Sequence, residues 1–309
     1  LRLAENDTVM AYDLAWEPNW GTRKDLARWD TAWAEWLTAK YGSLDDAAKA
    51  FGLPLPLEDG KVVGPSDEQM SVEGPHKAMV LAYRGFLNDL LRRYYGEAKR
   101  LVRSVDPNHL VSYRMSGAGD PLWAPPMTTY DFAGLRDGVD FMAPEGYGRI
   151  GPWERVRVGL WTAAYSRACA PNHPVWWAEF GDTVWSTALN GPNPERIKWQ
   201  AEFYDMFYKM VDQSNANGTC CWWYPGGYRV NERSDFGIIE PDGAWRPVTH
   251  VIAKWAPKLT APRERKPADV TITLDPTATV RGTAGLYEQC QKQYWEAIDA
   301  GRTVALKLP

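Results

Sequence analysis

Apolar and amphipathic segments alternate along most of this chain, from its start to about residue 258. Short runs rich in β-branched and aromatic residues predict strands at residues 8–15, 109–115, 139–144, 174–179 and 218–224. Longer amphipathic segments between them predict helices at residues 25–40, 76–103, 153–169 and 194–215. Alternating strands and helices are typical of a parallel sheet, so the pattern predicts an α/β fold made of βα units.

The character of the sequence changes after residue 258. Residues 259–267 include a charged stretch bounded by Pro262 and Pro267 and are predicted to form a linker. Residues 268–309 then read as strand, helix and strand. We therefore predict one large domain at residues 1–258 and the start of a C-terminal accessory domain at residues 268–309.

Two glutamates stand where a predicted strand gives way to a loop. Glu17 follows the first strand and precedes Pro18, and Glu179 follows the apolar run that begins at Pro174. The carboxyl ends of parallel strands form the rim where barrel enzymes keep their catalytic groups. Two carboxyl groups facing each other across such a cleft can hydrolyse a glycosidic bond. Ordinary salt bridges are the structural alternative.

Five strands are too few to close an eight-stranded barrel. An open five-stranded sheet would leave long apolar edges unpaired. We therefore expect the first three βα units to come from a missing segment or from another chain.

Composition argues against several classes of partner. The 35 basic and 39 acidic side chains give a formal net charge of −4 with both signs well mixed, which disfavours nucleic acid and anionic membranes. No apolar run approaches the roughly 20 residues of a membrane span. The chain has 17 tryptophans, more than an ordinary share. Flat aromatic faces suit the C–H faces of sugars, although large aromatic side chains also fill cores.

Neither cysteine nor histidine spacing indicates a metal site. The four cysteines are Cys169, Cys220, Cys221 and Cys290. They lack disulfide-framework or zinc spacing and are predicted to be reduced core thiols. The four histidines are His76, His109, His173 and His250. They form neither an H-x-H nor an H-E-x-x-H motif, so we expect no metal and no cofactor.

The two glutamate segments resemble motifs of a known group of enzymes. Residues 12–18, Tyr-Asp-Leu-Ala-Trp-Glu-Pro, resemble the strand-four motif of glycoside hydrolase clan A, the retaining TIM-barrel enzymes that include families 5 and 42. Residues 177–181, Trp-Ala-Glu-Phe-Gly, resemble the strand-seven motif. The resemblance covers about residues 1–258 and implies a (β/α)8 barrel, with this chain supplying about strands 4–8. Residues 33–37 and 40–44 also resemble family 42, which favours exo action.

The resemblance implies a retaining β-glycoside hydrolase that acts on a carbohydrate substrate, such as a plant or microbial polysaccharide or its oligosaccharides. Glu17 would be the general acid/base and Glu179 the nucleophile. Retaining enzymes hold these two carboxyl groups about 5–5.5 Å apart.

Other strand ends match supporting roles in the same group. Tyr147 stands where clan members carry a tyrosine that hydrogen-bonds the nucleophile. Glu145 stands where some relatives carry histidine and would contact a sugar hydroxyl, tune the pair of catalytic glutamates, or form a structural ion pair. Strand side chains alternate, so only one of Trp222 and Trp223 is expected to floor the sugar site, and we favour Trp223.

Four more residues have both a functional and a structural interpretation. Arg114 and Ser116, after the second strand of this chain, face the cleft or serve the fold. Asp235 and Glu232 bind sugar hydroxyls or cap a loop.

One residue departs from the clan pattern. Clan members generally carry asparagine before the acid/base, where it contacts the sugar 2-hydroxyl, and this chain has Trp16. The change is consistent with an unusual sugar, with another residue in that role, or with loss of activity. The alternative function is therefore a catalytically silent carbohydrate-binding or scaffold protein on the same barrel.

Overall fold

The computed structural model describes residues 3–18, 21–123, 131–262, 264–265 and 267–309. Residues 19–20 and 124–130, and residues 263 and 266 of the predicted linker, lie outside this range. The chain divides into two compact units. Unit 1 comprises Leu1–Met142, Tyr165–His173 and Ala268–Pro309, and unit 2 comprises Ala143–Ala164 and Pro174–Pro267.

A parallel strand pair carries the predicted acid/base segment in unit 1. Strand β1 (Ala11–Asp13) pairs in parallel with β4 (Leu110–Ser112). The pairing continues beyond the regular strands, because the amide of Arg114 donates to the carbonyl of Ala15 at 3.1 Å. The first two predicted strands are therefore confirmed as paired parallel segments, with a shorter regular part than predicted.

Unit 1 contains α1 (Arg23–Leu26), η1 (Ala27–Trp29), α2 (Asp30–Tyr41), α3 (Leu44–Phe51), the hairpin β2 (Leu57–Glu58) and β3 (Lys61–Val62), α4 (Lys77–Val105) and α5 (Phe132–Leu135). Helix α4 presents apolar residues at helical spacing to α2. Trp33 of α2 is fully buried, and its ring lies 5.1 Å from Tyr83 and 5.4 Å from Phe86, both in α4. These aromatic contacts, which exclude water, hold the two helices together.

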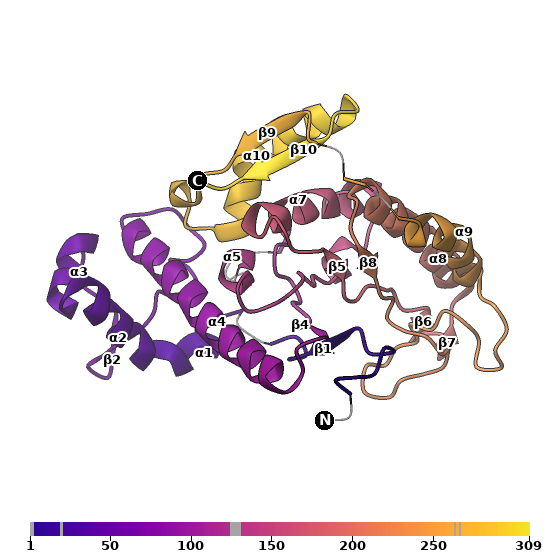
Figure 1. Ribbon diagram of the computed structural model, residues 1–309, viewed down its shortest axis with the longest axis horizontal. Helices are drawn as coiled ribbons and strands as arrows, with labels where there is room; N and C mark the ends of the chain where they lie inside the picture. The colour runs from indigo at the N-terminus through magenta and orange to yellow at the C-terminus, as the bar shows by residue number, and fades with distance from the viewer. Residues whose placement is uncertain (1–2, 19–20, 124–130, 263, 266) are drawn as a thin grey trace. The chain divides into compact units, whose positions relative to one another are not determined.

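The C-terminal residues form the predicted βαβ piece. Strands β9 (Val270–Thr273) and β10 (Val304–Lys307) are parallel, and η3 (Pro276–Ala278) and α10 (Gly282–Asp299) connect them (Figure 1). This piece belongs to unit 1, where Arg84 of α4 donates to the carbonyl of Val280 at 2.8 Å. The division of the chain at residues 259–267 stays a prediction.

Unit 2 is built around a second parallel pair, β5 (Trp176–Trp177) and β8 (Gly218–Thr219). It also contains η2 (Tyr147–Arg149), α6 (Trp153–Val156), the hairpin β6 (Trp185–Ser186) and β7 (Gly191–Pro192), α8 (Pro194–Gln213), α9 (Pro247–Thr260) and the first part of α7 (Gly159–Cys169). Helices α8 and α9 lie side by side (Figure 1). None of the helices in the described ranges combines the length and apolar character that crossing a membrane requires.

Local sequence explains where α8 begins. The side chain of Asn193 accepts a hydrogen bond from the amide of Glu195 at 2.8 Å, and Pro194 occupies the first helical position. In the core of unit 2 the ring of Phe207 of α8 stacks on Phe180, with centroids 3.9 Å apart. Helix α8 is thereby packed against the residue that follows Glu179.

The third predicted strand, residues 139–144, is wrong as a regular strand, since the described residues form none there. Pro144 has no amide hydrogen to donate to a ladder. Its carbonyl still accepts from the amide of Ala178 at 2.9 Å, and Glu145 forms an isolated parallel bridge with Glu179. An extended segment thus runs beside β5 in unit 2.

Candidate active site

Glu179 is a buried carboxylate held by a tyrosine. It lies two residues beyond β5 and is 5% exposed. The hydroxyl of Tyr147, at the start of η2, donates to Glu179 Oε2 at 3.0 Å. A hydrogen bond to a carboxylate fixes the orientation of that carboxylate. The contact expected from the resemblance is therefore present, and its role in catalysis stays a prediction.

Glu145 is a second buried carboxylic acid beside Glu179. Its residue is 4% exposed. It is paired with Glu179 in a parallel bridge. Residues directly opposite each other on neighbouring strands project to the same face, so both side chains lie on one face of unit 2. Tyr147, Glu145 and Glu179 are thus brought together as the sequence predicts.

Gly181 allows the loop after Glu179 to approach the loop after β8 closely. The amide of Trp222 donates to the carbonyl of Phe180 at 2.7 Å. A Cβ atom at Gly181 would lie 2.2 Å from the carbonyl oxygen of Trp222, closer than any side chain allows. The glycine of the Trp-Ala-Glu-Phe-Gly motif therefore permits close backbone approach.

The expectation that only one of two tryptophans faces the site rests on a wrong premise. Strand β8 ends at Thr219, so Trp222 and Trp223 do not alternate along a strand. The guanidinium carbon of Arg229 lies 4.9 Å from the ring centre of Trp222 and 4.3 Å from that of Trp223. Both indoles thus share one cationic neighbour. Trp223 as the floor of a sugar site stays a prediction.

Asp235 lies in a buried ionic cluster. It is 1% exposed and forms a bidentate pair with Arg246, at 3.0 and 2.8 Å. Arg246 also contacts Glu240 at 3.0 Å. Burial alone would lower the pKa of Arg246, but hydrogen bonds to Asp235 and Glu240 raise it. These contacts favour the loop-stabilising interpretation of Asp235 over direct sugar binding.

Glu232 pairs with Arg229 at 2.7 Å and accepts from the hydroxyl of Ser234 at 3.1 Å. Its contacts also stabilise the loop that follows β8.

Sequence reasoning missed Gln200 and Asp182, which connect helix α8 to the loop after Glu179. Gln200 of α8 is fully buried, and its amide donates to the carbonyl of Asp182 at 3.0 Å. The indole of Trp199 donates to Asp182 Oδ2 at 2.8 Å. Burial raises the pKa of Asp182. A polar residue on the apolar face of a helix was the available signal for Gln200, whereas nothing in the sequence marks Asp182.

The predicted residues of unit 1 surround the end of β1. Glu17 is exposed and has φ of 42°, a left-handed conformation uncommon outside glycine. The ring of Trp16 lies 4.5 Å from the guanidinium carbon of Arg114, which also pairs with Asp13 at 2.7 Å. Ser116 likewise has a positive φ of 45°. Within unit 1, Trp16 and Arg114 are therefore brought together beside Glu17.

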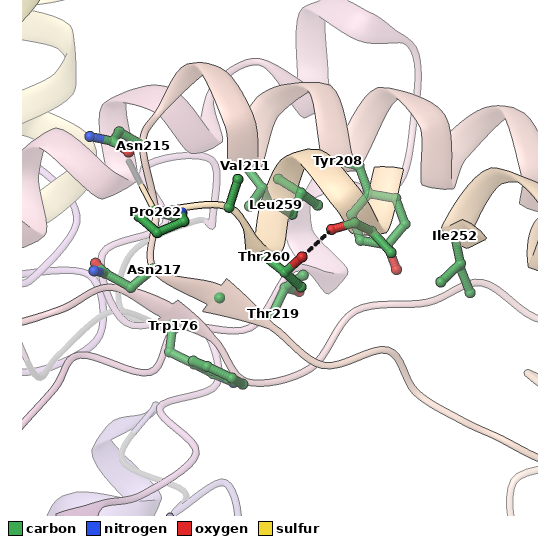
Figure 2. A pocket seen from close by; sticks show the side chains of 14 residues that line it. Trp176, Tyr208, Val211, Asn215, Asn217, Thr219, Ile252, Leu259, Thr260 and Pro262 are labelled. Carbon is green, nitrogen blue, oxygen red and sulfur yellow. Dashed lines mark hydrogen bonds between the residues drawn. The ribbon is translucent and has the colours of Figure 1, made fainter. Parts of the chain in front are cut away.

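A cavity of about 550 Å³ lies elsewhere in unit 2. Trp176, Gly218 and residues near the ends of α8 and α9 line it, including Thr260, whose hydroxyl donates to the carbonyl of Ala256 at 2.8 Å (Figure 2). None of its described lining residues is charged. Its lining residues Trp176 and Gly218 begin β5 and β8, whereas Glu179 follows the end of β5. Because its lining is uncharged, the cavity lacks groups for acid–base chemistry.

Comparison with known proteins places this geometry in context. No protein-family model and no curated protein matches the chain. It is similar over 99% of its length to the β-galactosidase of Bacillus circulans sp. alkalophilus, with a TM-score of 0.71, 15% identity and 46% of that chain covered. The β-galactosidase of Rahnella sp. R3 gives a TM-score of 0.69 and 18% identity, with 99% of this chain and 46% of that chain covered.

A GH5_18 enzyme from Streptomyces cattleya, solved in complex with Manβ1-4GlcNAc, gives a TM-score of 0.52 and 11% identity, with 97% of this chain and 94% of that chain covered. The chain shares its fold with glycoside hydrolases. It spans about half the length of the β-galactosidases that it matches. The resemblance to clan A found in the sequence is confirmed at the level of the fold.

Proposed function

We propose that this chain belongs to a retaining β-glycoside hydrolase with Glu179 as the nucleophile and Glu17 as the general acid/base. The observation that carries the proposal is the buried Glu179 carboxylate held by the Tyr147 hydroxyl at 3.0 Å. The fold shared with β-galactosidases and a GH5_18 enzyme supports it.

The proposed reaction has two displacements. The carboxylate of Glu179 attacks the anomeric carbon while the carboxylic acid of Glu17 gives its proton to the departing glycosidic oxygen. A covalent glycosyl ester on Glu179 results. Glu17, now a carboxylate, removes a proton from water, which attacks the anomeric carbon and releases the sugar with net retention. Tyr147 would orient the Glu179 oxygen during both steps.

The substrate class follows from the same arrangement. The paired indoles of Trp222 and Trp223 beside Arg229 offer apolar faces next to a hydrogen-bond donor, a combination that suits a sugar ring. The similar structures include a β-galactosidase and a GH5_18 enzyme in complex with the β-linked disaccharide Manβ1-4GlcNAc. We propose β-galactosides and β-mannosides as the first substrates to test.

We also propose that further βα units complete the barrel, supplied by another segment or another chain. Within the described residues, β1 pairs only with β4, and β5 only with β8. Parallel sheets with unpaired edges are rarely stable alone. In the complete protein, slow amide exchange at the free edge of β8 would support this proposal, and exchange at the rate of a solvent-exposed strand would contradict it.

The direct test of activity uses aryl β-glycosides of several sugars with the protein and matched variants. Glu179→Gln and Glu17→Gln are expected to lower kcat at least about 1000-fold on the preferred sugar, because each removes a group that acts in the transition state. The exposed Glu154 in unit 2 and Glu68 in unit 1 provide the control variants Glu154→Gln and Glu68→Gln.

Loss of hydrolysis only in the first two variants would support the assignment. If all four variants kept the wild-type rate, the assignment would be wrong. If the wild-type protein bound oligosaccharides without hydrolysing any glycoside, the silent sugar-binding protein suggested by Trp16 would replace it.

A further inference from the structure

Two aromatic side chains, one half-buried and one exposed, lie together in unit 2, outside the residues assigned above. The rings of Trp185 in β6 and Tyr228 in the loop after β8 have centroids 4.3 Å apart and planes inclined at 35°. Tyr228 is 44% exposed. Two inclined aromatic rings at the surface form a shallow apolar shelf, which we call the Trp185–Tyr228 shelf.

The shelf is held in place by its supporting loops. Thr183 accepts a hydrogen bond from the amide of Trp185 at 3.2 Å and another from the amide of Asp235 at 2.9 Å. The amide of Val184 donates to the carbonyl of Asp235 at 2.8 Å. These bonds tie the loop of Trp185 to the loop of Tyr228. Binding to a rigid shelf costs little ordering entropy.

The shelf continues toward the paired indoles through one side chain. Arg229 follows Tyr228 directly and lies against Trp222 and Trp223. Its pair with Glu232 and the backbone bridge between Arg229 and Ser234 fix its position. The guanidinium of Arg229 and the carboxylate of Glu232, groups that bind hydroxyls, therefore lie in the same loop as Tyr228.

We propose that the Trp185–Tyr228 shelf is a second sugar-binding subsite, which stacks a saccharide unit other than the one that Glu179 attacks. The occupant is a neutral oligosaccharide, because apolar ring faces bordered by hydrogen-bonding groups match the C–H faces and hydroxyls of a pyranose. This inference rests on the proposed function. It adds that the protein prefers oligosaccharides over glycosides of a single sugar.

The test measures how binding and hydrolysis depend on the number of sugar units. Oligosaccharides of one to five units of the preferred sugar are titrated into Glu179→Gln protein by calorimetry, and kcat/KM is measured for the same series with active protein. Trp185→Ala and Tyr228→Ala are each expected to weaken binding of the longest oligosaccharides about tenfold, the loss of one stacked apolar contact. Tyr228→Phe keeps the ring and is expected to retain most of the increase in affinity with the number of sugar units.

A matched control separates the shelf from exposed aromatics in general. Trp245 is 58% exposed in the same unit and its ring contacts His250. Trp245→Ala is expected to leave the dependence on chain length as in the wild type. Circular dichroism and thermal melting establish that each variant is folded, and Tyr228→Ala provides the test if Trp185→Ala does not fold.

Two results would overturn the subsite. One is binding and hydrolysis of the oligosaccharide series with no dependence on chain length, or with the same dependence in the wild type and in all variants. The other is a change in oligomeric state in the shelf variants, measured by sedimentation, without a change in sugar binding, which would assign the shelf to a second copy of the chain. Absence of both hydrolysis and sugar binding in the wild type would instead reject the proposed function.

Discussion

The hydroxyl of Tyr147 donates a hydrogen bond to Glu179 Oε2 at 3.0 Å, joining the residues that follow two neighbouring extended segments of unit 2. The backbone just before Tyr147 is hydrogen-bonded to the backbone of Glu179. Glu145 forms a parallel bridge with Glu179, and the amide of Gly146 donates to the Glu179 carbonyl at 2.6 Å. The backbone thus sets the position of the hydroxyl before any ligand binds, which is the preorganisation that electrostatic catalysis needs.

Tyr147→Phe removes this hydrogen bond and keeps the ring. We expect kcat on aryl glycosides to fall about 10- to 100-fold, because a hydrogen bond to a charged group contributes about 1.5–3 kcal/mol. Steady-state kinetics with the preferred aryl glycoside measure the effect. Tyr224→Phe, at a tyrosine that is 66% exposed, is the control and should change little. Equal rates for the wild type and Tyr147→Phe would exclude a positioning role for Tyr147.

Arg246→Leu leaves Asp235 as a buried, unpaired charge. We expect the free energy of unfolding to fall by about 3–5 kcal/mol, the usual effect of breaking a buried ion pair. Urea unfolding followed by fluorescence measures it. Lys254→Ala breaks an exposed pair with Asp205, at 2.9 Å, and should cost less than about 1 kcal/mol. If Asp235→Asn had the stability of the wild type but bound sugar more weakly, Asp235 would be a sugar ligand after all.

Gly181→Ala introduces a methyl group 2.2 Å from the carbonyl oxygen of Trp222. Since backbone rather than a flexible side chain stands in the way, we expect a loss of about 1–3 kcal/mol in stability. Gly191→Ala is the matched control, because the nearest atom to its added methyl group lies 3.8 Å away. Similar melting temperatures for the two variants would contradict the close approach of the two loops.

The stability of the chain should depend on pH through His109 and Asp106 of unit 1. His109 Nδ1 lies 2.7 Å from Asp106 Oδ2, and the hydroxyl of Tyr12 donates to the same oxygen at 2.6 Å. The hydrogen bond to Asp106 raises the pKa of His109. Burial would raise the pKa of Asp106, but hydrogen bonds from Tyr12 and His109 bring it below its usual range.

The signs of the two contributions differ. Protonated His109 stabilises the folded chain fully below its unfolded pKa of about 6.5, and this contribution is lost as the pH rises through the raised folded pKa. Asp106 contributes above its unfolded pKa of about 3.9, and its contribution is lost as the pH falls through the lowered folded pKa. Between pH 5 and 9, the free energy of unfolding measured with urea should therefore fall more steeply for the wild type than for His109→Gln. If the two variants showed the same dependence of this free energy on pH, the ion pair of His109 with Asp106 would be contradicted.

Part of this structure follows from local sequence. The contact of Tyr147 with Glu179 was expected from the resemblance to clan A, in which a tyrosine at this place hydrogen-bonds the nucleophile. Helix α9 was not predicted, because Pro257 lies inside it and the residues before Pro247 read as a loop. The Asp235–Arg246 pair joins residues eleven positions apart within irregular chain, where no periodicity exists to reveal it. Alternation failed for Trp222 and Trp223 because it presupposes a strand, and β8 ends at Thr219.

Trapping the proposed covalent intermediate would identify the nucleophile. An activated 2-deoxy-2-fluoro β-glycoside of the preferred sugar is incubated with the protein, and the labelled peptide is sequenced by mass spectrometry. We expect one equivalent of fluorosugar attached to Glu179. A label on Glu145 or any other residue, or no label from a protein whose first product has inverted configuration, would contradict this expectation.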